Sequence, residues 1–140
     1  MLAALFAEGA EYIIVGAHAL AAHGVPRATG DLDIWVRPTK DNARRVWRAL
    51  EAFGAPLQEL TLEDLSHPEV VFQIGLPPHR IDILTSITGV DFEEASDNRI
   101  VVEIEGLEVP VLGRGDLIRN KLAVGRTRDL ADIEDLGEAG

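Results

Sequence analysis

The sequence predicts a mixed α/β (α+β) domain. Two observations favour this class: short β-branched runs alternate with segments whose apolar residues recur at helical spacing, and glycines and prolines mark the breaks between them. The length of 140 residues is typical of one domain, and no repeat, low-complexity tract or linker divides residues 1–140.

The first part of the chain alternates between helical and strand patterns. Apolar residues at helical spacing predict a short helix over residues 1–7, and a β-branched run predicts a strand over 12–15. Small residues over 17–22 suit a helix that packs tightly on a sheet, and the glycines and proline of 24–30 predict a loop. Alternating polar and apolar residues over 31–36 predict a second strand.

A longer helix follows, and its limits are well marked. Thr39 is a good N-cap, an apolar stripe extends to Phe53, and Gly54 is a C-terminal stop. The remaining patterns predict a short helix over 60–66, a hairpin of strands 70–76 and 80–85, a second hairpin of strands 100–104 and 107–111, and helices over 116–124 and 128–136.

Composition excludes several classes of protein. The chain has no cysteine, so it has no disulfide, thiolate metal ligand or cysteine nucleophile. Its net charge of −11 repels phosphate backbones and disfavours tight non-specific binding of nucleic acid. The apolar runs are far shorter than the roughly 20 residues that span a bilayer, and the N-terminus lacks the basic region of a signal peptide. We therefore expect a cytoplasmic protein without a membrane partner.

Asp31 and Asp33 carry the strongest chemical signal. Residues i and i+2 of a strand lie on one face with α-carbons about 6.6 Å apart. Two carboxylates about 4 Å apart repel by roughly 4 kcal/mol at an effective dielectric of 20, so the pair favours a bound cation. Carboxylate oxygens suit Mg²⁺. Asp82 emerges from an apolar strand expected beside the first, and three carboxylates can hold two metal ions.

An Asp-x-Asp pair on a strand is, by itself, as typical of a solvated face as of a metal site. The preceding residues change this interpretation, because strand 12–15 ends at Gly16 and leads into a helix whose free backbone N–H groups can hold a triphosphate. Two metal ions stabilise both the attacking and the leaving oxygen of a displacement at phosphorus. The combination predicts phosphoryl or nucleotidyl transfer, with a phosphatase or nuclease that uses the same metals as an alternative.

The segment Val15-Gly16-Ala17, followed after thirteen residues by Asp31-Leu32-Asp33-Ile34, resembles the signature of the DNA polymerase β-like nucleotidyltransferase superfamily. Asp82 lies where such proteins place their third carboxylate. The resemblance implies the nucleotidyltransferase fold, a small mixed β-sheet flanked by helices. It also implies that Asp31, Asp33 and Asp82 bind two Mg²⁺ (or Mn²⁺) ions, and that a nucleoside monophosphate moves from a nucleoside triphosphate, such as ATP, to a hydroxyl acceptor.

The C-terminal segment carries a second likeness. Lys121, followed by Arg128-Asp129-x-x-Asp132, resembles the pattern of AbiEii-type and related toxin-like nucleotidyltransferases. That resemblance implies that Lys121 helps to bind the nucleotide phosphates, that Asp129 supports catalysis, and that a cognate antitoxin or toxin is a partner. The alternative is an ordinary charged helix face.

One residue departs from the signature. The second small residue of the family is usually Gly or Ser, and here it is Ala17, which lacks a hydroxyl but keeps its backbone N–H. Gly16 and Ala17 are expected to hold the β and γ phosphates. In the approach loop, Arg27 and Thr29 are candidates for a charged phosphate contact and a hydroxyl contact, or for shaping the turn.

The sequence leaves three candidates for the acceptor: RNA, a protein hydroxyl and a small molecule. The competing hypothesis is a noncatalytic module that binds a nucleotide or a partner protein, which Ala17 favours and which the three carboxylates oppose. Asp82 is expected to act as a metal ligand and as the general base for the acceptor hydroxyl.

Overall fold

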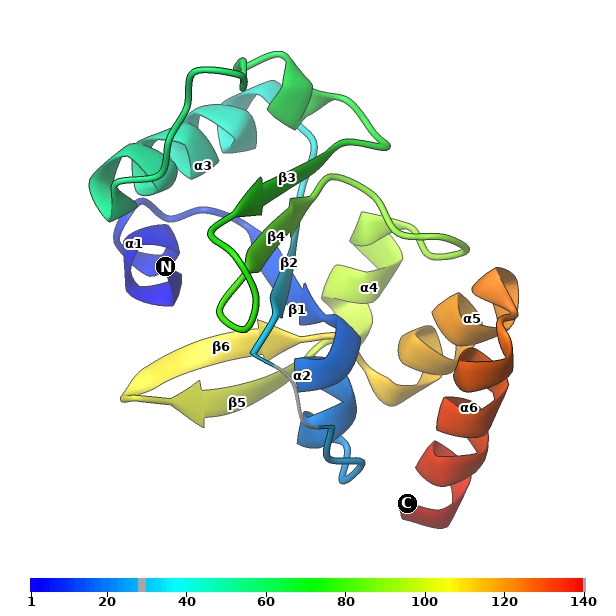
Figure 1. The fold of residues 1–140 in the computed structure, drawn as a ribbon. Coiled ribbons are helices and arrows are strands. Elements are labelled where there is room, and N and C mark those ends of the chain that lie inside the picture. Colours follow the sequence, from blue (N-terminus) through cyan, green and yellow to red (C-terminus); the bar gives the residue numbers. More distant parts are fainter. Residues whose placement is uncertain (28–29, 140) are drawn as a thin grey trace.

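The computed structural model describes residues 1–27 and 30–139. Helices and strands alternate along the first half of the chain, and two helices close it (Figure 1). The elements are α1 (Leu2–Ala7), β1 (Tyr12–Val15), α2 (Gly16–Ala22), β2 (Leu32–Val36), α3 (Lys40–Phe53), the 3₁₀ turn η1 (Asp64–Ser66), β3 (Val71–Ile74), β4 (Ile81–Leu84), α4 (Phe92–Asn98), β5 (Ile100–Ile104), β6 (Leu107–Val111), α5 (Arg114–Val124) and α6 (Thr127–Ala139).

Most predicted elements are confirmed, including both hairpins. Helix α4 was not predicted, because Phe92 and Ala95 are its only buried positions and two residues make no recognisable periodic stripe. Helix α5 begins two residues earlier than predicted, at Arg114, and β2 begins at Leu32, so Asp31 lies just before the strand.

The six strands form one mixed sheet in the order β3-β4-β2-β1-β6-β5. The pairing of the central strands determines where the carboxylates lie. β2 pairs antiparallel with β1 and parallel with β4, while β1 pairs parallel with β6. The N-terminal ends of β2 and β4 therefore meet at the same edge as the C-terminal end of β1.

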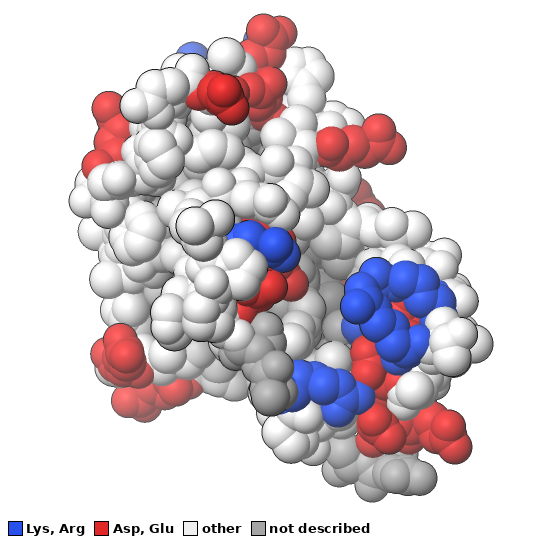
Figure 2. Space-filling view, viewed as in Figure 1, with Lys and Arg blue, Asp and Glu red and all other residues white. Residues whose placement is uncertain are grey.

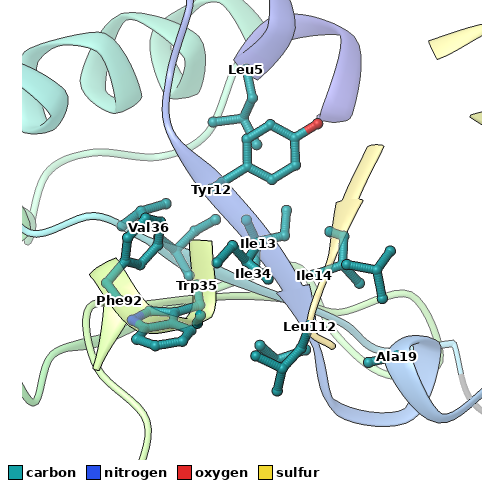
Figure 3. Close-up of a cluster of buried hydrophobic side chains, with 14 of the residues drawn as sticks. Leu5, Tyr12, Ile13, Ile14, Ala19, Ile34, Trp35, Val36, Phe92 and Leu112 are labelled. Carbon is teal, nitrogen blue, oxygen red and sulfur yellow. The ribbon is translucent and has the colours of Figure 1, made fainter. Parts of the chain in front are cut away.

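Both faces of the sheet are covered by helices. Figure 1 shows α1 and α3 on one side and α4, α5 and α6 on the other. Ile34 and Val36 point to one face of β2 and Trp35 to the other, and all three are at most 2% exposed. Trp35 meets Phe92 of α4 edge to face with ring centroids 4.9 Å apart, as Figure 3 shows.

This packing fixes the register of β2. A slip of one residue would turn Ile34 and Trp35 to the opposite faces, and each buried apolar side chain of this size contributes about 1.5 to 3 kcal/mol. The orientation of Asp33, which precedes them in the same strand, is set by their burial.

Among the described residues, no helix is both long enough and apolar enough to cross a membrane.

Candidate functional site

The two carboxylates of the strands are direct neighbours across the sheet. Asp33 in β2 is paired in register with Asp82 in β4, and on its other side it is paired with Val15 in β1. Asp31 lies two residues before Asp33, and the backbone N–H of Leu32 donates to the carbonyl of Arg80 at 2.9 Å. The sheet therefore brings the three predicted metal ligands to one edge.

Gly16 lies against this cluster. Its φ is +69°, which favours glycine, and a Cβ built on it would be 2.2 Å from Oδ2 of Asp33. The turn from β1 into α2 therefore passes directly beside the carboxylate. Both the backbone angle and the lack of a side chain at Gly16 are required for Asp33 to occupy its position.

Arg80 bridges the other two carboxylates. Its Nη2 is 3.3 Å from Oδ2 of Asp31, and its Nε is 2.9 Å from Oδ1 of Asp82. Both Nε and Oδ1 are buried, and neither makes a hydrogen bond within the described part of the chain, so their contact is a close ion pair without hydrogen-bond geometry. Arg80 Nη2 does donate to Oδ2 of Asp82, at 3.3 Å.

Asp33 has a different environment. Within the described part of the chain, no cation forms an ion pair with its carboxylate. Burial raises the pKa of Asp33, and the charges of Asp82 and Asp31 raise that pKa further, against smaller opposing effects of Arg80 and His18. The cluster therefore holds more negative charge than its arginine compensates.

The donor set fits a hard divalent cation, although the side chains are not arranged around one. Among residues 1–27 and 30–139, no three acidic or histidine side chains converge as a metal site. The reason is that Asp31 and Asp82 are directed toward Arg80. Among the described residues, Oδ1 of Asp82 makes no hydrogen bond and the carboxylate of Asp33 forms no ion pair, so these are the oxygens that a cation would satisfy.

A second charged cluster joins α5 to α6. Gly125, with φ of +70°, ends α5 and reverses the chain, which brings Lys121 next to the first turn of α6. Asp129 lies in that turn, fully buried, and accepts hydrogen bonds from the backbone N–H of Arg126 at 3.1 Å and from its Nε at 2.7 Å. Lys121 Nζ is 3.5 Å from Oδ1 of Asp129 and 3.0 Å from Oδ2 of Asp132.

These contacts determine the protonation state of Asp129. The hydrogen bond from Arg126 is the largest influence on its pKa and, helped by the charges of Arg126 and Lys121, holds that pKa at about 2 despite burial. Asp129 is thus ionised at neutral pH and anchors two cations, Arg126 and Lys121.

Arg27 connects this cluster to the first half of the chain. Its Nη2 donates to Asp132 at 2.5 Å and to Asp135 at 2.9 Å. Burial by itself raises the pKa of Asp132, but the hydrogen bonds from Arg27 and Lys121 outweigh it and lower that pKa. The contact fastens the loop after α2 to α6, across 105 residues of sequence.

One cavity of about 450 Å³ lies between the two clusters. Figure 2 shows basic side chains against acidic ones at the centre of this face and again over the helices to the right. Arg128 is exposed and lines the cavity, and within the described ranges it forms no ion pair. The lining residues are Gly16, Ala17, Leu20, Arg27, Asp31, Asp33, Arg80, Asp82, Lys121, Arg126, Arg128 and Asp132.

The cavity brings together most of the predicted site residues. Asp129 does not line it and instead anchors Lys121, while Thr29 lies outside the described residues. Sequence reasoning assigned no role to Arg80, Arg126, Arg128 or Asp132. The signal for Arg80 was its i−2 spacing from Asp82, which places both side chains on one face next to the predicted metal ligands.

Solved structures of known proteins share this fold. A Thermotoga maritima protein, TM1012, provisionally assigned as a nucleotidyltransferase, is 15% identical over 99% of this chain and 91% of its own, with a TM-score of 0.64. The lincosamide antibiotic adenylyltransferase LnuA, solved with lincomycin bound, is 14% identical over 99% of this chain and 93% of its own, with a TM-score of 0.61. No family model and no curated protein matches the sequence. The predicted nucleotidyltransferase fold is confirmed.

Proposed function

We propose that this protein is a metal-dependent nucleotidyltransferase that moves a nucleoside monophosphate from a nucleoside triphosphate to a hydroxyl acceptor. The observation that carries the proposal is the cavity in which an acidic cluster faces the cations of α5 and α6. Nucleotidyl transfer needs cations near the negative charge that develops in the transition state, and it needs hydrogen-bond donors around the phosphates. The residues that line this cavity include groups for both roles.

Asp31, Asp33 and Asp82 are the residues that would hold Mg²⁺ or Mn²⁺, in one or two positions. When bound, the ions neutralise the phosphates and stabilise the attacking and leaving oxygens. Oxygen ligands alone suit these metals, and the chain has no cysteine that would select a softer one.

The phosphates are assigned to the start of α2, beside Asp33, and to the cations of α5 and α6. Gly16 and Ala17 are the first residues of α2 and line the cavity, where their backbone N–H groups would serve as donors, and Lys121 and Arg128 line it from α5 and α6. Asp129 acts as a positioning residue, because it fixes Lys121 through a charged contact without touching the cavity itself. ATP is the first donor to test.

The chemical step follows from these positions. The acceptor oxygen attacks the α-phosphorus of the donor, its bond to phosphorus forms as the bond to the β-phosphate oxygen breaks, and pyrophosphate leaves. The proton of the acceptor hydroxyl passes to a carboxylate oxygen of Asp82, whose Oδ1 contacts Arg80 but makes no hydrogen bond among the described residues.

The acceptor is an RNA end, a protein hydroxyl or a small molecule. LnuA acts on an antibiotic, which supports including small molecules among the candidates. A cognate antitoxin or toxin is the proposed protein partner, and the proposed compartment is the cytoplasm.

Label transfer tests this function. The protein is incubated with Mg²⁺ and each α-³²P nucleoside triphosphate in the presence of cell RNA, cell protein or a small-molecule fraction. We expect label in one fraction with the wild type and none with the Asp31→Asn, Asp33→Asn double variant.

The controls separate the other candidate functions. Release of phosphate or nucleotide without a labelled acceptor would identify a hydrolase. Nucleotide binding without labelling of any fraction would favour the noncatalytic module, in which Ala17 reflects lost chemistry. A variant of Arg119, which lies outside the cavity lining, serves as the matched control for labelling.

A further inference from the structure

Arg80 lies where the proposed metal ligands converge. It contacts Asp31 at 3.3 Å and Asp82 at 2.9 Å, and it shares the cavity with Asp33. A guanidinium has a permanent charge and several donors, so it can serve two carboxylates from adjacent strands at once. In this structure Arg80 supplies the positive charge that a metal ion would supply.

The contact between Arg80 and Asp82 is incomplete, and this bears on whether a metal ion can replace the guanidinium. Nε of Arg80 and Oδ1 of Asp82 are close and buried, yet neither makes a hydrogen bond to any residue that the structure describes. Asp33 has no cation of its own among the described residues, and the neighbouring carboxylates raise its pKa. The guanidinium therefore compensates the cluster only in part.

We infer that Arg80 is a resident counter-ion that competes with the divalent metal for Asp31 and Asp82, so that metal binding requires its displacement. This inference rests on the metal site of the proposed function. Mg²⁺ binds carboxylate oxygens at about 2.0 to 2.1 Å, closer than the guanidinium lies, and both cations cannot occupy the same oxygens. Breaking the Arg80 contacts costs free energy, and this cost lowers the apparent affinity of the carboxylates for the metal.

Two readouts test the competition without relying on catalysis. Binding of Mn²⁺ is measured by calorimetry and by loss of the free-ion electron paramagnetic resonance signal, for the wild type, Arg80→Gln and Arg80→Lys. We expect Arg80→Gln to bind Mn²⁺ at least tenfold more tightly, and Arg80→Lys, which keeps the charge but not the bridging geometry, to show a smaller gain.

Thermal unfolding provides the second readout. Without metal, Arg80→Gln should melt below the wild type, because Asp31 and Asp82 lose their contacts with the guanidinium, and saturating Mn²⁺ should raise its Tm by more than that of the wild type. Arg119→Gln is the matched control, since it removes the same charge from a site that contacts Glu94 and Asp116 instead.

The outcomes separate this inference from the proposed function. If the wild type binds Mn²⁺, and Asp33→Asn does not, but Arg80→Gln binds no more tightly than the wild type, Arg80 is not a competitor. Weaker binding by Arg80→Gln would show that Arg80 positions the ligands instead. If neither the wild type nor the Arg80 variants bind Mn²⁺, the metal site itself, and with it the proposed function, is wrong.

Discussion

The carboxylate of Asp33 occupies the space beside the α-carbon of Gly16 that the side chain of any other residue would enter. A Cβ at Gly16 would be 2.2 Å from Oδ2 of Asp33. The glycine that follows β1 and the aspartate of β2 are therefore a matched pair, in which the missing side chain of one makes room for the other.

Gly16→Ala should disrupt this pair. The positive φ costs about 1 to 2 kcal/mol for a residue with a Cβ, and the clash with Asp33 adds to this cost. We expect lower stability in urea unfolding and loss of metal binding. Gly9→Ala is the control, because Gly9 has φ of +66° and open space around it. Equal losses in the two variants would contradict the role of the clash.

Asp33→Asn should stabilise the metal-free protein while it abolishes metal binding. Burial and neighbouring charges raise the pKa of Asp33 above 3.8, so its ionised form is unfavourable to folding at neutral pH. Substitutions that relieve such functional strain commonly gain about 0.5 to 2 kcal/mol. The penalty is absent below the unfolded pKa and grows as pH rises through the folded pKa, so the gain measured by unfolding should disappear below about pH 4.

Asp129→Asn should destabilise the protein at neutral pH. Loss of charged hydrogen bonds at a buried carboxylate costs about 2 to 3 kcal/mol. The folded pKa is about 2 and the unfolded value is 3.8, so this stabilisation is complete above the unfolded pKa and is lost as pH falls through the folded one. The difference between wild type and variant should shrink below about pH 4 in denaturant titrations. A difference that is constant with pH would show that the charge of Asp129 is not the cause.

Arg27→Gln should loosen α6 without unfolding the protein. Arg27 is partly exposed, and such ion pairs contribute about 0 to 1 kcal/mol. Hydrogen exchange should therefore accelerate in α6, where Asp132 and Asp135 lose their partner, and stay unchanged in β1 and β2. Arg44→Gln, which removes an exposed ion pair on α3, is the control and should leave α6 unaffected.

The fold could be predicted where local patterns are strong. Thr39 and Gly54 mark α3 in the sequence, and the structure shows Thr39 accepting a hydrogen bond from Asn42 and Gly54 in the left-handed conformation. The turn Glu105-Gly106 also has positive φ at both residues, as a tight hairpin requires. Helix α4 could not be predicted, since its place depends on Phe92 meeting Trp35 from a distant strand.

The candidate site was predictable in its carboxylates but not in its ion pairs. Alternation along the strand placed Asp31 and Asp33 on one face, and an apolar run isolated Asp82. The partners of Arg27, and the contact of Arg80 with Asp31, depend on tertiary contacts between segments that are far apart in the sequence. For the same reason sequence spacing alone did not show that Asp129 is buried beneath the cavity wall.

The order of the strands along the chain has a consequence for synthesis. β1, β2, β3 and β4, with all three carboxylates, lie within residues 12–84, whereas α5 and α6 follow them within residues 114–139. On the ribosome the acidic half of the cavity is complete in sequence before the cationic half emerges. A nascent chain therefore contains the three carboxylates before it contains Lys121 and Arg128, and the cavity between them is complete only once α6 has docked on Arg27.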